Sequence, residues 1–417
     1  MTPAIRTATR PIGRLDRPWT TASTATVLGP LRAPARQALV EAIARTAARW
    51  PESRLGWSID GAGRRWCRPP ARLDDVADGM VTDLDTDPGL DYGRFLTGLV
   101  HDERQGWPLA FSVGHDHVAM RMSHAIGDGR ALVVLLSRLL ESAATGRPAA
   151  FPPRPAMPPF AAALGNFFGR SPRRVLAAAR AIRHAPPAAQ VATRPWSPRR
   201  VTLYHRIPGE LATEVRRWRK TSASGATSAA VDLCLIMRAL HLSGVPVSPE
   251  VRVLYDVRRY LPVSYPELHG NFSVGLLMTM SAAMPAERIS DMIARAGAAG
   301  RPLTALGAGL AFGARALRSP VTAPVRPRAD LAFTYLGRPL PIERLPWRAG
   351  SVPVWSGSVQ PAAPQGLTFA VTETGRAVHL SASFHANVLD AGRIEQAMTL
   401  MAADPIAVLT SRENLGV

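Results

Sequence analysis

One short stretch of the chain carries residue types that can do acid–base chemistry. His124, Gly127, Asp128 and Gly129 follow Ser123 in the run SHAIGDG. An imidazole has an unperturbed pKa of about 6.5, so His124 could take a proton from an alcohol or amine at neutral pH and pass it to a leaving group. The spacing alone equally suits an ordinary structural histidine at the end of a strand.

The residues on either side of this stretch have two different periodicities. Apolar residues alternate with others over 117–123, which predicts a strand. Five leucines then recur at helical spacing over 132–140, which predicts a helix. The histidine is therefore expected in a turn between a strand and a helix, where α/β enzymes often place their chemistry.

The other members of the stretch each have a structural interpretation beside a functional one. Gly127 and Gly129 allow a tight turn and a close approach of substrate. Asp128 suits the N-cap of the predicted helix. It could also be a buried carboxylate, and a buried charge needs a cationic partner.

Length and composition indicate a globular chain with two lobes. The 417 residues are too many for one ordinary core, and 47% of them are hydrophobic. The two cysteines, Cys67 and Cys234, lie far apart, so we expect no disulfide framework, no metal site and a reducing compartment. The sequence shows neither an apolar leader nor a run that could span a bilayer, so we expect a cytoplasmic protein without a transmembrane segment.

The formal charge of +19 narrows the choice of partners. No basic stripe interleaved with aromatic residues occurs, which argues against nucleic acid. No acidic residue lies between Glu141 and Glu210, and the Pro- and Arg-rich segment 151–200 is predicted to cross between lobes. This basic segment would suit an acidic carrier protein or a phosphorylated cofactor, although a solvated linker fits equally well and a weak membrane-surface contact stays open.

The second half of the chain predicts further regular elements. A helix over 231–240 is apolar almost all round, so it should be central. Strands are expected at 252–256, 270–280, 329–336, 352–355, 367–371 and 378–384. A polar stretch rich in aspartate, including Asp74, Asp75, Asp83, Asp85, Asp87 and Asp91, occupies 74–91.

These motifs resemble a known family. The run HAIGDG at 124–129 matches the HxxxDG motif of the chloramphenicol acetyltransferase-like superfamily of thioester-dependent acyltransferases, which includes condensation domains, wax ester synthases and polyketide-associated acyltransferases. Four further segments match that family in the right order: 224–227, 255–262, 270–274 and 333–337. The resemblance covers about residues 10–405.

The resemblance implies a fold and an organisation. We expect an α/β fold of the α+β sandwich type, with two chloramphenicol acetyltransferase-like lobes arranged as a V around a central tunnel that holds His124. The N-terminal lobe would span residues 1–150, the crossover 151–200 and the C-terminal lobe 201–417.

The resemblance also implies an activity. We expect an acyltransferase that moves an acyl group from a coenzyme A or acyl-carrier-protein thioester to a hydroxyl, with His124 as general base and no acyl-enzyme. Acyl-CoA or acyl-phosphopantetheine would be a cosubstrate, no cofactor would be bound permanently, and a monomer would act on a small-molecule acceptor. An amide-forming condensation enzyme and a catalytically silent scaffold of the same fold are the alternatives.

The roles of the family's residues are assigned to this chain only where its motifs match. Asp128 would support the His124 loop by pairing with Arg258, or with Arg259 as second choice. The residues assigned to the tunnel are Ser123, Asn271, Thr334 and Tyr335. Asn271 could equally cap a turn, and Tyr335 could equally belong to the core. Ser123 stands where many family members have another histidine, and Thr334-Tyr335 stands where some carry Ser-Asn.

Overall fold

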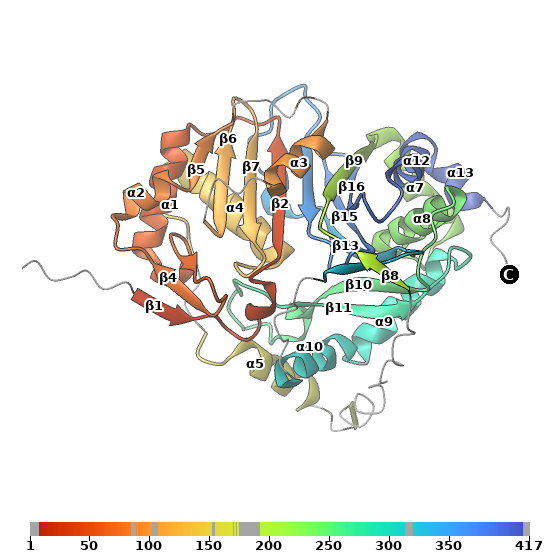
Figure 1. Ribbon diagram of the computed structural model, residues 1–417, viewed down its shortest axis with the longest axis horizontal. Coiled ribbons are helices and arrows are strands. Elements are labelled where there is room, and N and C mark those ends of the chain that lie inside the picture. The colour runs from red at the N-terminus through yellow and green to blue at the C-terminus, as the bar shows by residue number, and fades with distance from the viewer. Residues whose placement is uncertain are drawn as a thin grey trace, which may run out of the picture.

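The computed structural model describes residues 8–84, 91–101, 107–151, 155–169, 192–312 and 320–411, with the isolated positions 89, 171, 173 and 174. Figure 1 shows two lobes side by side, one built from the N-terminal part of the chain and one from the C-terminal part. The mixed α/β composition and the two lobes agree with the predicted fold class.

The N-terminal lobe is organised around a five-stranded sheet with the order β14-β2-β7-β6-β5. All neighbours in it are antiparallel except β5 and β6. Its strands are β2 (Ser23–Gly29), β5 (Val81–Asp83), β6 (Leu109–Val113), β7 (Val118–Ser123) and β14 (Val354–Val359). Its helices are α1 (Arg36–Arg49), α2 (Leu73–Asp78), α4 (Gly129–Thr145) and the short α11 (Leu340–Glu343), and a small sheet adds β1 (Ala8–Pro11), β3 (Ser58–Ile59) and β4 (Arg65–Arg68).

The C-terminal lobe is organised around a six-stranded sheet with the order β11-β10-β13-β15-β16-β9. Its strands are β9 (Arg200–Ile207), β10 (Glu250–Asp256), β11 (Ser273–Thr279), β13 (Asp330–Gly337), β15 (Gly366–Thr374) and β16 (Ala377–His385). Its helices are α7 (Gly209–Ser222), α8 (Ser228–Leu242), α9 (Ala286–Ala298), α12 (Ala391–Ala403) and α13 (Pro405–Thr410). As the apolar run predicted, α8 is central, since it packs against α7, α9, α12, α13 and β13.

Three peripheral groups complete the described fold. The short strands β8 (Thr193–Pro195) and β12 (Thr322–Pro324) pair with each other. The helices α5 (Pro159–Phe168) and α10 (Arg301–Phe312) form a separate apolar cluster with the short helix η3 (Val257–Tyr260). The helix α3 (Tyr92–His101) packs against β2 and β14 of one lobe and β9 of the other, so it joins the two lobes.

The structure corrects the predicted domain boundaries. Strand β14 pairs along its whole length with β2, so residues 201–417 do not all belong to the C-terminal lobe. Trp355 of this strand and Ile342 of α11 are buried in the N-terminal core. The same strand also contacts β15 and β16, which explains how every residue of β16 comes to be buried. The chain thus returns to its first lobe after building most of its second.

Two predicted segments, 74–91 and 151–200, contain regular elements. The polar stretch 74–91 contains α2 and β5, and the interlobe helix α3 follows directly. The predicted crossover 151–200 contains α5 and β8, but most of its arginine-rich part lies outside the described residues.

Candidate active site

The loop between β7 and α4 has a compact turn that presents His124. Ser123 closes the turn, because its carbonyl accepts from the N–H of Ile126 at 2.9 Å and its Oγ accepts from the N–H of Ala125 at 3.3 Å. Gly127 lets this loop approach the C-terminal lobe: a Cβ there would lie 2.6 Å from the Ala131 Cβ and 3.5 Å from the Gly270 Cα.

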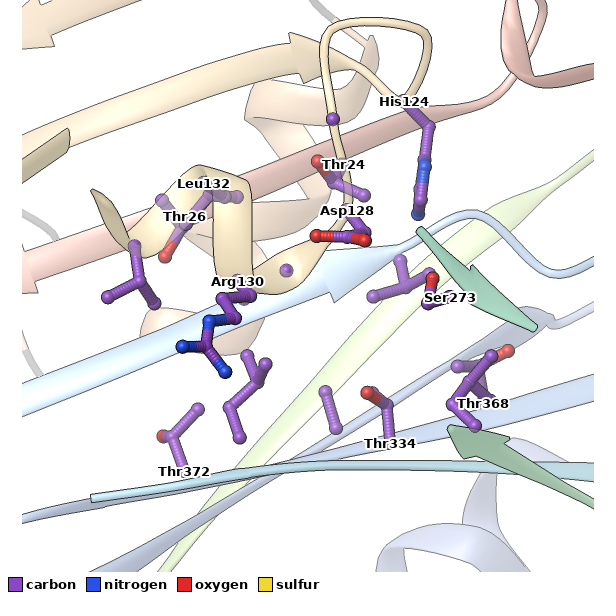
Figure 2. Close-up of a pocket in the computed structure, with 18 of the residues that line it drawn as sticks. Thr24, Thr26, His124, Asp128, Arg130, Leu132, Ser273, Thr334, Thr368 and Thr372 are labelled. Atoms are coloured by element: carbon purple, nitrogen blue, oxygen red, sulfur yellow. The ribbon is translucent and has the colours of Figure 1, made fainter. Parts of the chain in front are cut away.

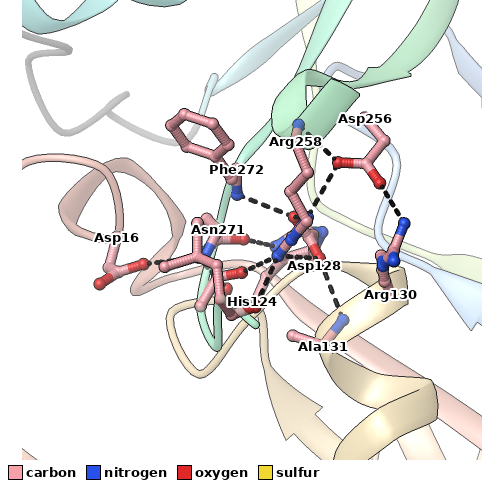
Figure 3. Close-up of polar contacts among 11 residues, drawn as sticks. Asp16, His124, Asp128, Arg130, Ala131, Asp256, Arg258, Asn271 and Phe272 are labelled. Atoms are coloured by element: carbon pink, nitrogen blue, oxygen red, sulfur yellow. Dashed lines mark hydrogen bonds and ion pairs between the residues drawn. The ribbon is translucent and has the colours of Figure 1, made fainter. Parts of the chain in front are cut away.

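Asp128 combines the two structural roles that its position predicted. Its Oδ1 accepts from the N–H of Ala131 at 3.1 Å, which caps α4. Its carboxylate also receives both terminal nitrogens of Arg258, at 2.8 and 3.1 Å, and the N–H of Phe272 at 2.8 Å. The predicted Asp128–Arg258 pair is therefore present, bidentate and almost fully buried (Figure 3).

Arg258 extends this pairing into a chain of charges that joins the lobes. It also contacts Asp256 at 3.1 Å, and Asp256 in turn pairs with Arg130 of α4 at 3.1 Å. Because a buried ion pair that loses one partner leaves an uncompensated charge, this chain holds the His124 loop against the C-terminal lobe. Arg259, the second choice, instead lies beside Gly297 and over the ring of Tyr260.

His124 itself is held on several sides. Its ring stacks on Trp19, with centroids 4.5 Å apart and planes 23° apart. Its Nδ1 lies 2.9 Å from Oδ1 of Asn271, and its backbone N–H donates to the carbonyl of Ala22 at 2.7 Å. Burial lowers the pKa of His124 below 6.5, against the opposing effect of the nearby Asp128 charge, so the ring is neutral at physiological pH.

A cavity of about 480 Å³ lies beside His124 and between the lobes. From the N-terminal lobe it is lined by the His124 loop, Trp19, the start of α4, and parts of β2 and β14. From the C-terminal lobe it is lined mainly by one face of β10, β13 and β15. Figure 2 shows the side chains of His124, Asp128 and Arg130 on one side of this space and those of Thr334, Thr368 and Thr372 on the other.

The register of the C-terminal sheet decides which of its residues face the cavity. Ala332 pairs with Arg252 and with Thr368, and Thr334 pairs with Ala370, so these residues share one face. Their sequence neighbours point to the other face, where Val253, Phe333 and Phe369 are buried in the core. This face of the sheet therefore presents Arg252, two alanines and the hydroxyl groups of Thr334 and Thr368 to the cavity.

Solved structures of similar shape share this two-lobed arrangement. Polyketide synthase associated protein 5 from Mycobacterium tuberculosis matches with a TM-score of 0.56 at 14% identity, over 96% of this chain and 99% of that chain. The TRI3 trichothecene 15-O-acetyltransferase from Fusarium sporotrichioides matches at 0.55 and 14% identity, over 94% and 95%. The condensation domain from the Monacolin K polyketide synthase MokA matches at 0.57 and 12% identity, over 95% and 98%.

This chain has the chloramphenicol acetyltransferase-like fold. The likeness extends over nearly the full length of both partners in each match, which confirms the fold that the HxxxDG run predicted. Searches with the sequence against protein-family models and against curated proteins give no match.

Within this fold, most of the predicted site residues meet at one cavity. Those that line it are His124, Gly127, Asp128, Gly129, Arg258, Thr334 and Tyr335. The hydroxyl of Tyr335, however, donates to Oε1 of Glu373 at 2.6 Å and is already used inside the C-terminal lobe.

Two predicted tunnel residues do not line the cavity. Ser123 is buried, and its side chain serves the turn. Asn271 is buried as well and contacts His124 from behind. Ser123 was assigned to the tunnel as the residue in the place of a second histidine, and Asn271 as part of the matched segment 270–274. A match in sequence does not show to which side of a turn a side chain points.

Three residues at the site escaped the sequence analysis. Trp19 stacks on His124, and Asp16 and Arg54 form an ion pair of 2.6 Å behind it. None belongs to a recognisable motif, and each is more than 60 positions from the histidine, so no local pattern points to them.

The described residues contain no group of three or more His, Cys, Asp or Glu side chains that could hold a metal ion. Among the helices of the described part of the chain, none is both long and apolar enough to cross a bilayer.

Proposed function

We propose that the protein is an acyltransferase that transfers an acyl group from a thioester to a hydroxyl, with His124 as the general base. The observation that carries this proposal is a half-buried histidine with a lowered pKa beside a cavity between two lobes of this fold. A neutral imidazole can accept a proton. A cavity that is lined by both lobes can hold two reactants close together.

In the proposed reaction, His124 removes the proton of the acceptor hydroxyl. The acceptor oxygen attacks the thioester carbonyl, the carbon–sulfur bond breaks, and the histidine returns the proton to the departing thiolate sulfur. No bond forms between the acyl group and the protein. Asp128 and Arg258 act as positioning residues, since their charges neutralise each other beside the loop.

The donor is proposed to be acyl-CoA or an acyl carrier protein. Arg130 and Arg252 both line the cavity, and both side chains are largely exposed. Arg252 has no ion-pair partner among the described residues, and its stem lies flat over Gly275. Two exposed cations in the lining of the cavity would favour a donor that carries phosphate.

An assay of purified protein tests the proposal. Wild type and His124→Ala are incubated with acyl-CoA or acyl-carrier donors and a panel of alcohols and amines, and products are identified by mass spectrometry. Loss of a general base should slow product formation about 10²- to 10⁴-fold. His205→Ala, which alters a histidine paired with Glu395 outside the cavity, should retain activity.

Each outcome of this assay has a distinct meaning. Equal rates for wild type and His124→Ala would rule out His124 as the base. Amide products alone would favour the condensation reaction over ester formation. No product with any donor would favour a catalytically silent protein with this fold.

A further inference from the structure

Two buried polar side chains, Asp16 and Asn271, form a line that ends on Nδ1 of His124. Asn271 lies two residues before β11 in the C-terminal lobe, and Asp16 lies in the N-terminal segment just before Trp19. Oδ1 of Asn271 is 2.9 Å from Nδ1 of His124, and Nδ2 of Asn271 is 2.9 Å from Oδ1 of Asp16. Figure 3 shows this line running from Asp16 through Asn271 to the histidine.

The surroundings of Asn271 define which way its amide points. Its Nδ2 faces two acceptors, the Asp16 carboxylate and the backbone carbonyl of His124 at 2.7 Å. An amide nitrogen carries two hydrogens and can donate to both, whereas an amide oxygen there would face two other oxygens. The oxygen of Asn271 must therefore be the atom that faces His124.

That orientation determines the tautomer of the imidazole. An amide oxygen only accepts, so the 2.9 Å contact requires a hydrogen on Nδ1. In a neutral ring the other nitrogen, Nε2, then carries the lone pair. The lone pair is the feature that a general base needs.

Asp16 is itself held by an ion pair from the loop that follows α1. Arg54 lies 2.6 Å from its Oδ2, and another nitrogen of Arg54 donates to the carbonyls of Ala125 and Ile126, each at 2.7 Å. The backbone N–H of Asn271 also donates to Asp16, at 3.3 Å. The same cation thus secures both the carboxylate that orients Asn271 and the turn that carries His124.

We propose that Asn271 and Asp16 are positioning residues that hold His124 in the tautomer with hydrogen on Nδ1, which leaves Nε2 as the atom that accepts the acceptor's proton. The catalytic part of this proposal rests on the proposed acyl transfer, but the tautomer of His124 is a property of the resting protein. A merely structural role for Asn271, as a link between lobes, would leave the tautomer unaffected by its substitution.

The first test is nitrogen NMR of the full chain labelled with ¹⁵N-histidine, at a pH where His124 is neutral. The His124 signals are assigned by their loss in His124→Gln. We expect a protonated Nδ1 and an unprotonated Nε2 in the wild type. In Asn271→Leu we expect the population to shift toward hydrogen on Nε2, because the amide oxygen that requires a hydrogen on Nδ1 is gone.

A matched control is available in Asn166→Leu. This substitution removes another amide that donates to a backbone carbonyl, that of Tyr260 at 3.0 Å, but makes no contact with His124. It should leave the His124 signals unchanged. A wild-type ring protonated on Nε2, or identical His124 signals in Asn271→Leu, would overturn the proposal.

The second test separates tautomer control from chain stability. Asp16→Asn keeps an oxygen that can accept from Asn271 but removes the charge, so we expect a smaller shift of the tautomer than in Asn271→Leu. The wild-type spectrum decides the tautomer even if Asn271→Leu does not fold, and Asp16→Asn then decides the positioning role. No shift in Asp16→Asn would remove Asp16 from the proposal.

Kinetics distinguish failure of this inference from failure of the proposed function. If acyl transfer is observed, kcat should fall about 10- to 100-fold in Asn271→Leu with little change in KM. An unchanged kcat beside a shifted tautomer would contradict the positioning role. If the predicted tautomer is observed but the protein has no acyl-transfer activity, the proposed function is wrong and the tautomer assignment still holds.

Discussion

At the scale of single residues, His124 is set up as a base by competing electrostatic effects. Burial in the interlobe site disfavours the charged imidazolium, whereas the Asp128 carboxylate, a hydrogen bond to the backbone of His124 and the contact with Asn271 favour it. Burial is the larger effect, so the pKa is lowered. The Asp128 charge is shared with Arg258, which limits how far it can raise the pKa of the histidine.

This balance predicts the pH dependence of the proposed reaction. The base works only when neutral, so kcat/KM should fall as pH decreases through the His124 pKa, with a midpoint below 6.5. Asp128→Asn removes the negative charge that opposes burial, so the midpoint should move to still lower pH. The measurement is kcat/KM against pH for both proteins, and a wild-type midpoint above 6.5 would contradict the account.

At the scale of elements, α3 shows how closely the lobes are fitted. Its face toward the C-terminal lobe contains Gly93, where a Cβ would lie 2.8 Å from the carbonyl oxygen of Thr202 and 3.0 Å from the nitrogen of Tyr204. These are backbone atoms of β9, which cannot move as a side chain could. The helix can approach this strand only because no side chain intervenes.

Two substitutions in the same helix should therefore have opposite effects. Gly93→Ala should reduce the free energy of unfolding by about 1–3 kcal/mol, because the added methyl overpacks the interface. Gly98→Ala should raise it by up to about 1 kcal/mol, because a Cβ there meets nothing within 4 Å and alanine favours the helix. Denaturant titration measures both, and equal effects of the two substitutions would show that α3 does not pack as described.

At the scale of the whole molecule, the net charge and the cavity between the lobes both bear on how an anionic donor would bind. The chain has a formal net charge of +19, and the exposed side chains of Arg130 and Arg252 line the cavity. A strongly positive protein attracts anions over distances comparable to the screening length, which is about 10 Å at 0.1 M salt. The proposed donors, acyl-CoA or an acidic acyl carrier protein, are anionic, so this attraction would act on the donor.

The role of the cavity arginines can be measured with two donors. Arg252→Gln should raise the KM for acyl-CoA about three- to tenfold at low salt, and the difference should shrink as salt increases. The KM for the corresponding acyl-pantetheine, which lacks phosphate, should not change. Arg295→Gln, which alters an exposed arginine paired with Asp291, is the control. Equal effects on both donors would exclude phosphate recognition by Arg252.

Local patterns were enough to predict the strand, turn and helix around His124, the central α8 and the late strands. Each depends on periodicity or on a cap within a few residues, and these are short-range properties of the chain. The HxxxDG run and its ordered companions extended this to the two-lobed fold and to the Asp128–Arg258 pair. Helix α3 was missed, since the polar stretch before it obscured its start.

Contacts between distant segments could only come from the folded chain. Asn271 meets His124 from 147 positions away, and Asp16 meets Asn271 from 255 positions away. Strand β14 joins the N-terminal sheet although it follows most of the C-terminal lobe, because an edge strand pairs with whichever edge packing brings to it. Periodicity shows which face of an element is buried, but the partner that covers that face depends on how the two lobes pack.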